Sequence, residues 1–463
     1  MTSPLDTPFN TLPLRPELLA SVESLEYSAM SAIQMQALPA ILDKRDVLAQ
    51  ARTGSGKTAA FALGLLDKLE IQTYRTQALV LCPTRELADQ VAADIRRLAS
   101  ALPNTRVLTL CGGKPMQAQL NSLRRDAHVI VGTPGRVLKH LEKGSLLLDG
   151  VRTLVLDEAD RMLDMGFHDD IIRILDRTDR RRQTLLFSAT YPDQIRQISE
   201  AVQVDPVEIR VESLQQEEPI RQVFYAVEEN DKSAALLAVL QSNQPDSCIV
   251  FCNRKQHCQS LTQALLDQGY WAKALHGDLD QQARDESILL FANGSTSILV
   301  ATDVAARGLD IDTLAAVINH DMALDPDTHV HRIGRTGRAG HGGLAISFVL
   351  PNEQYRLEAI EQRLERRFPV EQWPRSEARR SRPALPATVT LHINAGRKDK
   401  IRPGDIVGAL TAGESLNKEQ IGKITVQDRK AYVAVDRDQG SLALEVLNGG
   451  RIKGRRFKVR LLR

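Results

Sequence analysis

Short apolar runs, each ending in polar residues, recur through the first half of the chain. Helical patterns separate them, for example from Thr58 to Leu69 and from Leu87 to Leu98. Continuous apolar strands that alternate with helices predict a parallel sheet covered on both faces, and such sheets bind ligands at the carboxyl ends of their strands. The polar clusters lie at that end of every run. The runs span residues 46–54, 78–84, 128–134, 154–160 and 184–190.

The second half of the chain repeats this alternation and predicts a second α/β domain of similar design. A polar stretch without periodicity near residues 205–220 separates the two domains, and a Pro- and Arg-rich break at 367–386 follows the second. We therefore expect domains at residues 1–208 and 209–368, and a linker at 369–386. The second set of apolar runs spans residues 248–254, 273–278, 298–304, 316–321 and 344–350.

Residues 387–463 show a different pattern, with shorter apolar stretches and alternating positions. The expected order of elements, β-α-β-β-α-β, is typical of ferredoxin-like and RNA-recognition-motif folds. The expected strands lie near residues 389–393, 424, 432 and 457–461, and the expected helices near 404–410 and 441–447.

Composition is typical of a globular protein. Of the 463 residues, 43% are hydrophobic and 25% are charged. The sequence has no apolar stretch of 18 or more residues that would span a membrane. Its first residues, MTSPLDTPFNTL, lack the basic and apolar regions of a secretory signal. We therefore expect a cytoplasmic protein without membrane partners, and nothing in the pattern indicates more than a monomer.

The five cysteines form no CxxC pair, and most of them lie in or beside apolar strand-like runs. Buried, reduced thiols are therefore favoured over zinc ligands or disulfides. The cysteines are Cys82, Cys111, Cys248, Cys252 and Cys258.

Charge is distributed unevenly, although the formal net charge is only +2. Residues 381–463 contain 17 lysines and arginines against 8 aspartates and glutamates, whereas the preceding residues contain 43 against 50. A basic module joined to a near-neutral or acidic one indicates a polyanionic partner, for which nucleic acid is the obvious candidate.

The segment ARTGSGKT follows an expected strand and opens an expected helix, which is the context of a phosphate-binding loop. Glycines let backbone amides approach phosphate oxygens, and a helix N-terminus favours negative charge. Lys57 would reach the β- and γ-phosphates, and Thr58 would bind Mg²⁺. A plain glycine-rich turn is the alternative. The candidate nucleotide-binding residues are Ala51, Arg52, Thr53, Gly54, Ser55, Gly56, Lys57 and Thr58.

The sequence DEAD at residues 157–160 ends another expected strand, about a hundred residues after this loop. Asp157 would hold Mg²⁺, and Glu158 would polarise the attacking water. An acidic helix N-cap is the alternative. The combination of the DEAD sequence with a phosphate loop favours the catalytic interpretation.

The sequence HRIGRTGR at residues 331–338 places three arginines beside glycines. A basic surface cluster is one interpretation. The first domain, however, offers no obvious arginine to neutralise the charge that develops on the γ-phosphate. Arg335 and Arg338 would supply it from the second domain as arginine fingers, and hydrolysis would then require the two domains to close.

With these motifs in this order, residues 9–350 resemble the DEAD-box ATP-dependent RNA helicases. The resemblance implies two tandem RecA-like parallel-sheet domains, with ATP and Mg²⁺ as cofactors. It also implies an adenine-reading element that includes Phe9, with Tyr27 stacked on the adenine ring and Gln34 at its edge.

The sequence departs from the family at two positions of this element, where Glu26 replaces the usual glycine and Met30 the usual proline. Asp310 is implied to approach the ribose of the nucleotide. The residues implied to couple nucleotide state to RNA binding are Ser188, Ala189, Thr190 and His331.

The same resemblance implies a groove for the RNA backbone. Hydroxyls, arginines and backbone amides suit sequence-independent contacts to phosphates. The implied groove residues are Pro83, Thr84, Arg85, Gly112, Gly113, Thr133, Pro134, Gly135, Arg136, Gln281, Arg284, Thr302 and Asp303.

The basic C-terminal module is similar to the RNA-binding domain of bacterial DbpA-type helicases, which bind a hairpin of large-subunit ribosomal RNA. Its only aromatic residues, Tyr432 and Phe457, are too few for the usual base-stacking platform. Recognition is therefore expected to depend on basic residues, although residues 451–460 also resemble a solvated edge strand. The candidate RNA contacts are Arg397, Lys398, Lys400, Lys430, Tyr432, Arg451, Lys453, Arg455 and Arg456.

Together these features predict an RNA-dependent ATPase, an RNA helicase of α/β fold with a small α+β RNA-recognition-motif-like domain. Its expected substrate is short duplexes of 23S ribosomal RNA in large-subunit precursors. An ATP-gated RNA clamp and a general RNA chaperone without a ribosomal target remain alternatives. A DNA translocase is a third.

Overall fold

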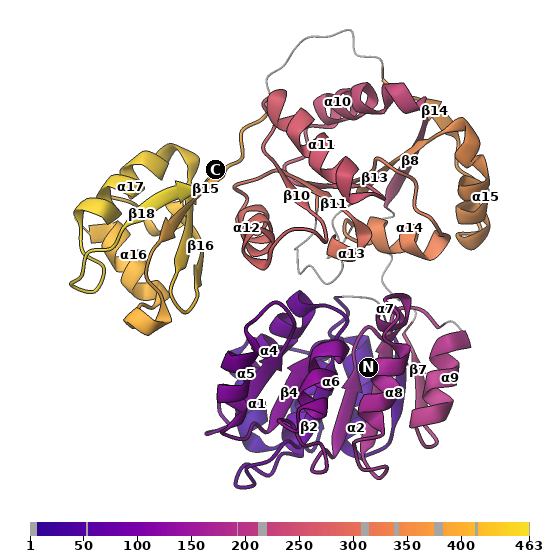
Figure 1. Ribbon diagram of the computed structural model, residues 1–463, viewed down its shortest axis with the longest axis vertical. Coiled ribbons are helices and arrows are strands. Elements are labelled where there is room, and N and C mark those ends of the chain that lie inside the picture. The colour runs from indigo at the N-terminus through magenta and orange to yellow at the C-terminus, as the bar shows by residue number, and fades with distance from the viewer. Residues whose placement is uncertain are drawn as a thin grey trace. The chain divides into compact units, whose positions relative to one another are not determined.

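The computed structural model divides into two compact units near residue 214. The first unit contains one sheet and the second unit contains two (Figure 1). The structure describes residues 7–51, 54–191, 193–211, 220–306, 314–337, 342–374, 383–412 and 415–462.

The first sheet has seven parallel strands in the order β3-β4-β2-β5-β6-β1-β7. This confirms the expected parallel sheet. The sequence pattern missed β3 and β7, which form its two edges and are only partly buried. The strands are β1 (Val47–Gln50), β2 (Ala78–Leu81), β3 (Val107–Leu110), β4 (Val129–Gly132), β5 (Thr153–Leu156), β6 (Gln183–Ser188) and β7 (Val207–Arg210).

Helices cover both faces of this sheet (Figure 1). They are α1 (Pro16–Ser24), α2 (Ala32–Leu42), α3 (Lys57–Asp67), α4 (Arg85–Leu98), α5 (Met116–Leu123), α6 (Pro134–Glu142), α7 (Ala159–Asp164), α8 (His168–Leu175) and α9 (Asp193–Val202), with a short 3-10 helix at Phe9–Thr11.

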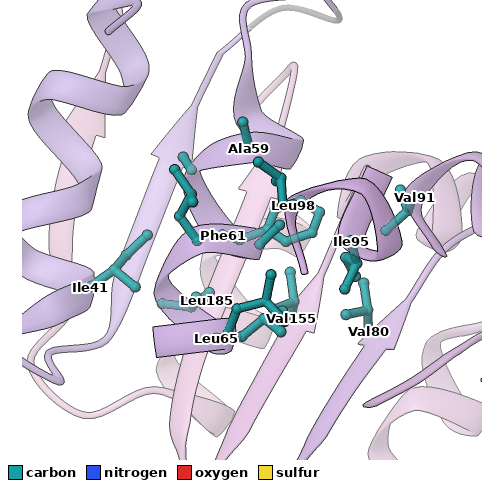
Figure 2. Packing of buried hydrophobic residues seen from close by; sticks show 14 of the residues in the cluster. Ile41, Ala59, Phe61, Leu65, Val80, Val91, Ile95, Leu98, Val155 and Leu185 are labelled. Atoms are coloured by element: carbon teal, nitrogen blue, oxygen red, sulfur yellow. The ribbon is translucent and has the colours of Figure 1, made fainter. Parts of the chain in front are cut away.

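The two faces form separate cores because alternate residues of each strand point in opposite directions. On one face, Phe61 and Leu65 of α3 pack near Val155 and Leu185 of the sheet (Figure 2). On the other face, neighbouring strand residues such as Leu154 pack against α6, α7, α8 and α9. The inner strands of this sheet are thus buried on both faces, and they appear in the sequence as continuous apolar runs for that reason.

The second sheet also has seven parallel strands, in the order β10-β11-β9-β12-β13-β8-β14. Its last strand lies inside the segment expected to be a linker, because its three exposed residues carry no apolar pattern. The strands are β8 (Arg221–Ala226), β9 (Cys248–Phe251), β10 (Ala272–Leu275), β11 (Ile298–Ala301), β12 (Ala316–Asn319), β13 (Leu344–Val349) and β14 (Val370–Gln372).

Helices and two 3-10 turns connect these strands. The helices are α10 (Lys232–Asn243), α11 (Lys255–Asp267), α12 (Gln281–Ala292), α13 (Asp303–Ala306), α14 (Pro326–Ile333) and α15 (Gln354–Arg363), and the 3-10 turns are Glu229–Asp231 and Pro351–Glu353.

The third sheet is antiparallel, with the strand order β16-β17-β15-β18 and two helices. The order of elements along the chain is β-α-β-β-α-β, as expected. The elements are β15 (Thr388–Ile393), α16 (Pro403–Thr411), β16 (Ile421–Val426), β17 (Ala431–Asp436), α17 (Gly440–Gly449) and β18 (Val459–Leu462), with 3-10 turns at Arg397–Asp399, Lys418–Gln420 and Arg437–Gln439.

The third sheet contacts the domain before it through polar and apolar groups. Thr390 Oγ1 accepts a hydrogen bond of 3.1 Å from Asn293 Nδ2, and Thr388 Oγ1 donates one of 2.6 Å to the Asn293 carbonyl oxygen. The Arg437 guanidinium lies 4.4 Å from the centre of the Trp271 ring. The sequence pattern gave no sign of this contact, because each partner belongs to a locally complete fold.

All five cysteines are buried and unpaired, as expected from their positions in apolar runs. Among the helices of the described ranges, none combines the length and apolarity needed to cross a membrane.

Candidate nucleotide and RNA sites

The phosphate-loop candidate lies between β1 and α3, as its sequence context requires. Gly54 and Gly56 have φ of +82° and +92°, in the left-handed region that favours glycine. A Cβ atom on Gly56 would also lie 2.5 Å from Gln34 Nε2. Of the predicted residues, Arg52 and Thr53 lie outside the described ranges.

The N-terminus of α2 holds this loop from one side. Ser31 Oγ donates a 2.7 Å hydrogen bond to the Ser55 carbonyl oxygen, and Gln34 Nε2 donates one of 3.1 Å to that of Gly56. Gln34 Oε1 accepts from the Ser31 amide at 2.8 Å. Both the oxygen and the nitrogen of the Gln34 side-chain amide therefore form hydrogen bonds with the protein backbone. An adenine contact by Gln34 stays a prediction.

The two family departures take up distinct positions beside this loop. Glu26 has φ of +58°, which explains why glycine is the usual residue there. Met30 is buried in the apolar core. Tyr27 is 37% exposed and its ring centre lies 6.4 Å from that of buried Phe9, so part of the Tyr27 side chain is open to solvent.

Lys57 and Asp157 place two buried charges near each other at the strand ends. Both are at least 94% buried, because their exposed fractions are 6% and 3%. Within the described part of the chain, neither Lys57 Nζ nor Asp157 Oδ1 has a hydrogen-bond partner. Such groups are costly to bury unless a ligand satisfies them. An ammonium for phosphate and a carboxylate for a cation therefore fit a metal–nucleotide complex.

Burial raises the pKa of the Asp157 carboxyl to about 7, although nearby Lys57 lowers it. The folded pKa thus exceeds the unfolded value of 3.8, so the ionised carboxylate destabilises the nucleotide-free fold and this cost grows as the pH rises toward 7.

Replacing Asp157 by Asn is therefore expected to stabilise the nucleotide-free chain at about pH 8, by at most about 4 kcal/mol, and by about half as much near pH 5.5. Urea titrations followed by circular dichroism measure this difference. Asp169→Asn, which changes an exposed carboxylate, serves as the control and is expected to show no such pH-dependent gain. Equal stability of Asp157→Asn and the wild type at about pH 8 would show that burial does not strain this carboxylate.

Asp160, the third residue after Asp157, explains how the DEAD segment is held. Asp160 Oδ2 accepts hydrogen bonds from the Thr190 hydroxyl at 2.9 Å, the Thr190 amide at 3.0 Å and the Ala189 amide at 3.2 Å. Ser188 Oγ donates to the Thr190 carbonyl oxygen at 2.6 Å. One carboxylate therefore joins the DEAD segment to residues 188–190, which we call the SAT segment. The sequence analysis gave Asp160 no role, although its position in DEAD was a usable signal.

Glu158 has a strained backbone at the start of α7. Its φ is +52°, a conformation that few residues other than glycine adopt, and its exposed fraction is 7%. Such strain concentrates at functional sites, because the surrounding structure must enforce it.

The RNA-groove candidates of the first domain follow three neighbouring strands, β3, β4 and β2. Arg85 packs against Gly112, where an added Cβ would lie 3.1 Å from its Nη2 atom. Arg136 Nη1 donates to the Lys114 carbonyl oxygen at 3.0 Å and to Gln119 Oε1 at 2.9 Å. The topology thus brings the segments that follow these strands together at the carboxyl ends of the strands. These segments contain Pro83, Thr84, Gly113, Thr133, Pro134 and Gly135.

Gln119, which the sequence analysis missed, orients Arg136 from a buried position. Its Nε2 donates to the Cys111 carbonyl oxygen at 2.8 Å, and its Oε1 lies 2.9 Å from His140 Nε2. An isolated glutamine in a helix carries no sequence signal for such a role.

The arginine-rich motif of the second domain contains a fully buried arginine that was also missed. Arg332 is 2% exposed and binds both carboxylate oxygens of Asp303, at 2.6 and 2.7 Å. It also donates to Asn253 Oδ1 at 2.7 Å and to the Asp321 carbonyl oxygen at 2.7 Å. Arg332 therefore fixes the orientation of Asp303.

The other predicted residues of this domain lie around the same strand ends. Thr302 donates its amide to the Leu275 carbonyl oxygen at 3.1 Å, and Arg284 Nη2 donates to that of Ala305 at 2.8 Å. Gln281, at the N-terminus of α12, donates to Asp285 at 2.7 Å. Arg335 is 8% exposed. Outside the described ranges lie Asp310 and Arg338, whereas His331 lies in α14.

Three loops of the third domain converge and bring predicted basic residues together. Arg397 Nε donates to the Val426 carbonyl oxygen at 3.0 Å, and Lys453 Nζ donates to that of Lys400 at 2.9 Å. Gly396 allows this approach, since an added Cβ would lie 2.2 Å from the Gln427 carbonyl oxygen. We call the exposed basic residues of two of these loops, 397–400 and 451–456, the basic cluster: Arg397, Lys398, Lys400, Arg451, Lys453, Arg455 and Arg456.

Two of the predicted RNA contacts, Lys430 and Tyr432, do not belong to the basic cluster. Lys430 is half-buried. Tyr432 is 6% exposed and packs with Leu290 and Leu462, while its ring centre lies 5.2 Å from that of His392. The Tyr432 ring thus has no free face for a base in this structure, because α12 of the preceding domain covers it.

Three regions of the chain match known protein families. The family models for the DEAD/DEAH box helicase, the helicase conserved C-terminal domain and the DbpA RNA binding domain match residues 31–198, 231–340 and 390–461. The chain is 51% identical over 459 residues to an ATP-dependent RNA helicase DbpA of Escherichia coli (strain K12), covering 99% of this chain and 100% of that protein.

A second relative and a solved structure extend this similarity. The chain is 37% identical to an ATP-dependent RNA helicase DbpA of Bacillus subtilis (strain 168), covering 97% of this chain and 98% of that protein. It is also similar to Saccharomyces cerevisiae Dbp5 bound to RNA and ADP BeF3, with 34% identity and a TM-score of 0.71 over 77% of this chain and 93% of that one.

Proposed function

Because this chain belongs to the DEAD-box family of ATP-dependent RNA helicases, we propose that it locally separates short duplexes of 23S ribosomal RNA during assembly of the large ribosomal subunit. The observation that carries the ribosomal target is the third domain, which matches the DbpA RNA binding domain and presents the basic cluster. Action on ribosomal RNA implies a cytoplasmic protein, and a single copy contains all the parts that the proposal needs.

In this proposal Lys57 binds the β- and γ-phosphates of ATP, and Thr58 and Asp157 hold Mg²⁺. The cation, when bound, neutralises charge on the phosphates. Burial supports these roles, since the Lys57 Nζ and Asp157 Oδ1 atoms are inaccessible to solvent and have no competing hydrogen bond among the described residues.

Glu158 orients and polarises the attacking water, because its carboxylate follows Asp157 directly in the chain. Arg335 and Arg338 stabilise the developing negative charge as arginine fingers. The bonds from Thr190 and Ala189 to Asp160 support a coupling role for SAT, since a shift of the DEAD segment would pull on the SAT backbone.

RNA recognition divides between a general and a selective part. Two parts of the chain contact the RNA backbone without reading its sequence. They are the segments that follow β2, β3 and β4 of the first domain, with Arg85 and Arg136, and the segment around Asp303. The basic cluster selects and anchors the ribosomal RNA. A tethered anchor raises the local concentration of nearby duplexes for the helicase domains.

Removing two charges of the basic cluster tests the anchor. Lys398 and Arg455 are suitable, because their side chains are 61% and 62% exposed and their partners Asp428 and Asp399 are 3.9 and 3.8 Å away. The double variant Lys398→Ala/Arg455→Ala is expected to raise the half-maximal concentration of a 23S hairpin RNA by about tenfold or more, with an unchanged ATPase rate at saturating RNA.

The control removes two exposed lysines outside the three loops, as Lys418→Ala/Lys423→Ala. The readout is ATPase rate against RNA concentration at one fixed salt concentration. If both double variants raise the half-maximal RNA concentration equally, the basic cluster only adds to the general positive charge of the domain and is not a recognition site.

A further inference from the structure

Three side chains that are common metal ligands meet in the second domain. Their ligand atoms, on Cys252, His320 and Asp321, all lie within 4.8 Å of one another, and all three residues are buried. Cys252 directly follows β9, and His320 and Asp321 directly follow β12. These strands are neighbours in the sheet, so the backbone itself sets the approach of the three side chains.

His320 has an unused donor atom in this group. Its side chain is 10% exposed, and within the described ranges neither ring nitrogen has a hydrogen-bond partner. Nδ1 lies 3.5 Å from Asp321 Oδ1, too far for a good hydrogen bond. The ring is held edge-on to Phe348, with centres 5.9 Å apart. An imidazole that is buried with one long contact to a carboxylate is costly, and a metal ion would supply a stronger partner.

We propose that Cys252, His320 and Asp321 bind a divalent cation of the zinc class. Sulfur, nitrogen and oxygen donors together suit zinc, whereas magnesium and calcium prefer oxygen alone. Zinc bond lengths in a tetrahedron separate ligand atoms by about 3.4–3.6 Å, so the three donors need to close by about 1 Å. Binding releases the thiol proton of Cys252 to solvent, and the neutral imidazole donates its lone pair.

The neighbouring groups show what occupation would change. Asp321 Oδ1 accepts from Lys232 Nζ at 2.8 Å, and Oδ2 accepts from the Asn253 amide at 2.9 Å. A bound cation repels the Lys232 ammonium, which has Glu229 as an alternative partner at 3.6 Å. Two further donors lie near this group, since the Cys258 thiol interacts with Cys252 and His257 Nδ1 lies 3.8 Å from Asp321 Oδ2.

The test is a cobalt titration of the full chain in magnesium-free buffer with a thiol-free reductant. Cobalt(II) reports its ligands, since thiolate ligation gives a sulfur-to-metal charge-transfer band and a tetrahedral site gives strong ligand-field bands. We expect both bands to saturate at one equivalent and to disappear when zinc is added. Cys252→Ala and His320→Phe are each expected to weaken binding by at least about tenfold.

His320→Phe retains an aromatic ring against Phe348, so the fold is expected to survive and a loss of binding reports on ligation. The matched control is Cys248→Ala, which removes a buried thiol at the other end of β9 and is expected to keep the cobalt bands. Absence of a charge-transfer band in the wild-type chain at several-fold excess cobalt would overturn the proposal. So would a band that persists unchanged in Cys252→Ala or His320→Phe.

Discussion

Replacing Glu158 by Gln is expected to lower the RNA-stimulated ATPase rate by at least about 100-fold while ATP and RNA still bind. Gln has the size of Glu but cannot take a proton or polarise water as a carboxylate does. The backbone at this position is left-handed, with φ of +52°, and already carries a side chain of that size, so the exchange adds no new backbone strain. The neighbouring Asp160 keeps its bonds to Thr190 and Ala189.

Two measurements separate this outcome from a general defect. Single-turnover hydrolysis gives the chemical rate, and RNA dissociation in the presence of ATP is expected to become slower, since hydrolysis no longer ends the closed state. Glu142→Gln is the matched control, because Glu142 is half-exposed and pairs with Arg173 on the surface. A rate for Glu158→Gln within about tenfold of the wild type would remove Glu158 from its proposed role.

Replacing Lys57 by Ala is expected to abolish hydrolysis for a different reason, loss of ATP binding. The ammonium is buried and has no partner among the described residues, so the phosphates would be its counter-ions. The expected fall in ATPase rate is at least about 100-fold. Alanine at the first residue of α3 favours the helix, and its introduction leaves no hydrogen bond broken, so the fold is expected to survive.

Equilibrium titration with a fluorescent ATP analogue distinguishes the two variants, since Glu158→Gln retains affinity and Lys57→Ala loses it. Lys114→Ala provides the control, because the ammonium of this lysine forms an exposed pair with Asp89. Unchanged nucleotide affinity in Lys57→Ala would mean that the buried ammonium does not face the phosphates.

The sequence predicted fully buried strands well and most partly exposed strands poorly. Strands such as β9, β11 and β12 are covered on two faces and therefore appear as continuous apolar runs. The half-exposed inner strand β8 was missed, whereas the edge strand β10 was predicted. The edge strands β3, β7 and β14 are short and partly exposed, so they carry no such run. The first sheet thus continues to Arg210, past the boundary expected at residue 208, and the second continues into the expected linker.

Motif residues were predictable from spacing, whereas the residues that hold them were not. Lys57 and Asp157 belong to patterns with a known chemical purpose. Gln119 and Arg332 act through bonds to residues distant in the chain, and such contacts exist only after folding. Tyr432 shows the converse, because an aromatic residue that the sequence assigns to RNA is covered by a helix of another domain.

That domain contact also affects how the anchor is tested. Deleting residues 381–463 would uncover Leu290 and remove the partners of Asn293 and Trp271. A deletion therefore changes the second domain as well as RNA binding. Surface substitutions in the basic cluster avoid this effect and are the better design.

The most direct test of the ribosomal assignment compares two RNAs of equal length in steady-state ATPase assays at one moderate salt concentration. One contains large-subunit ribosomal hairpins, and the other is a scrambled duplex. Salt must be fixed because phosphate contacts dominate affinity. The account predicts a much lower half-maximal concentration for the ribosomal RNA. Equal half-maximal concentrations would contradict it and leave an RNA helicase whose third domain is a general tether.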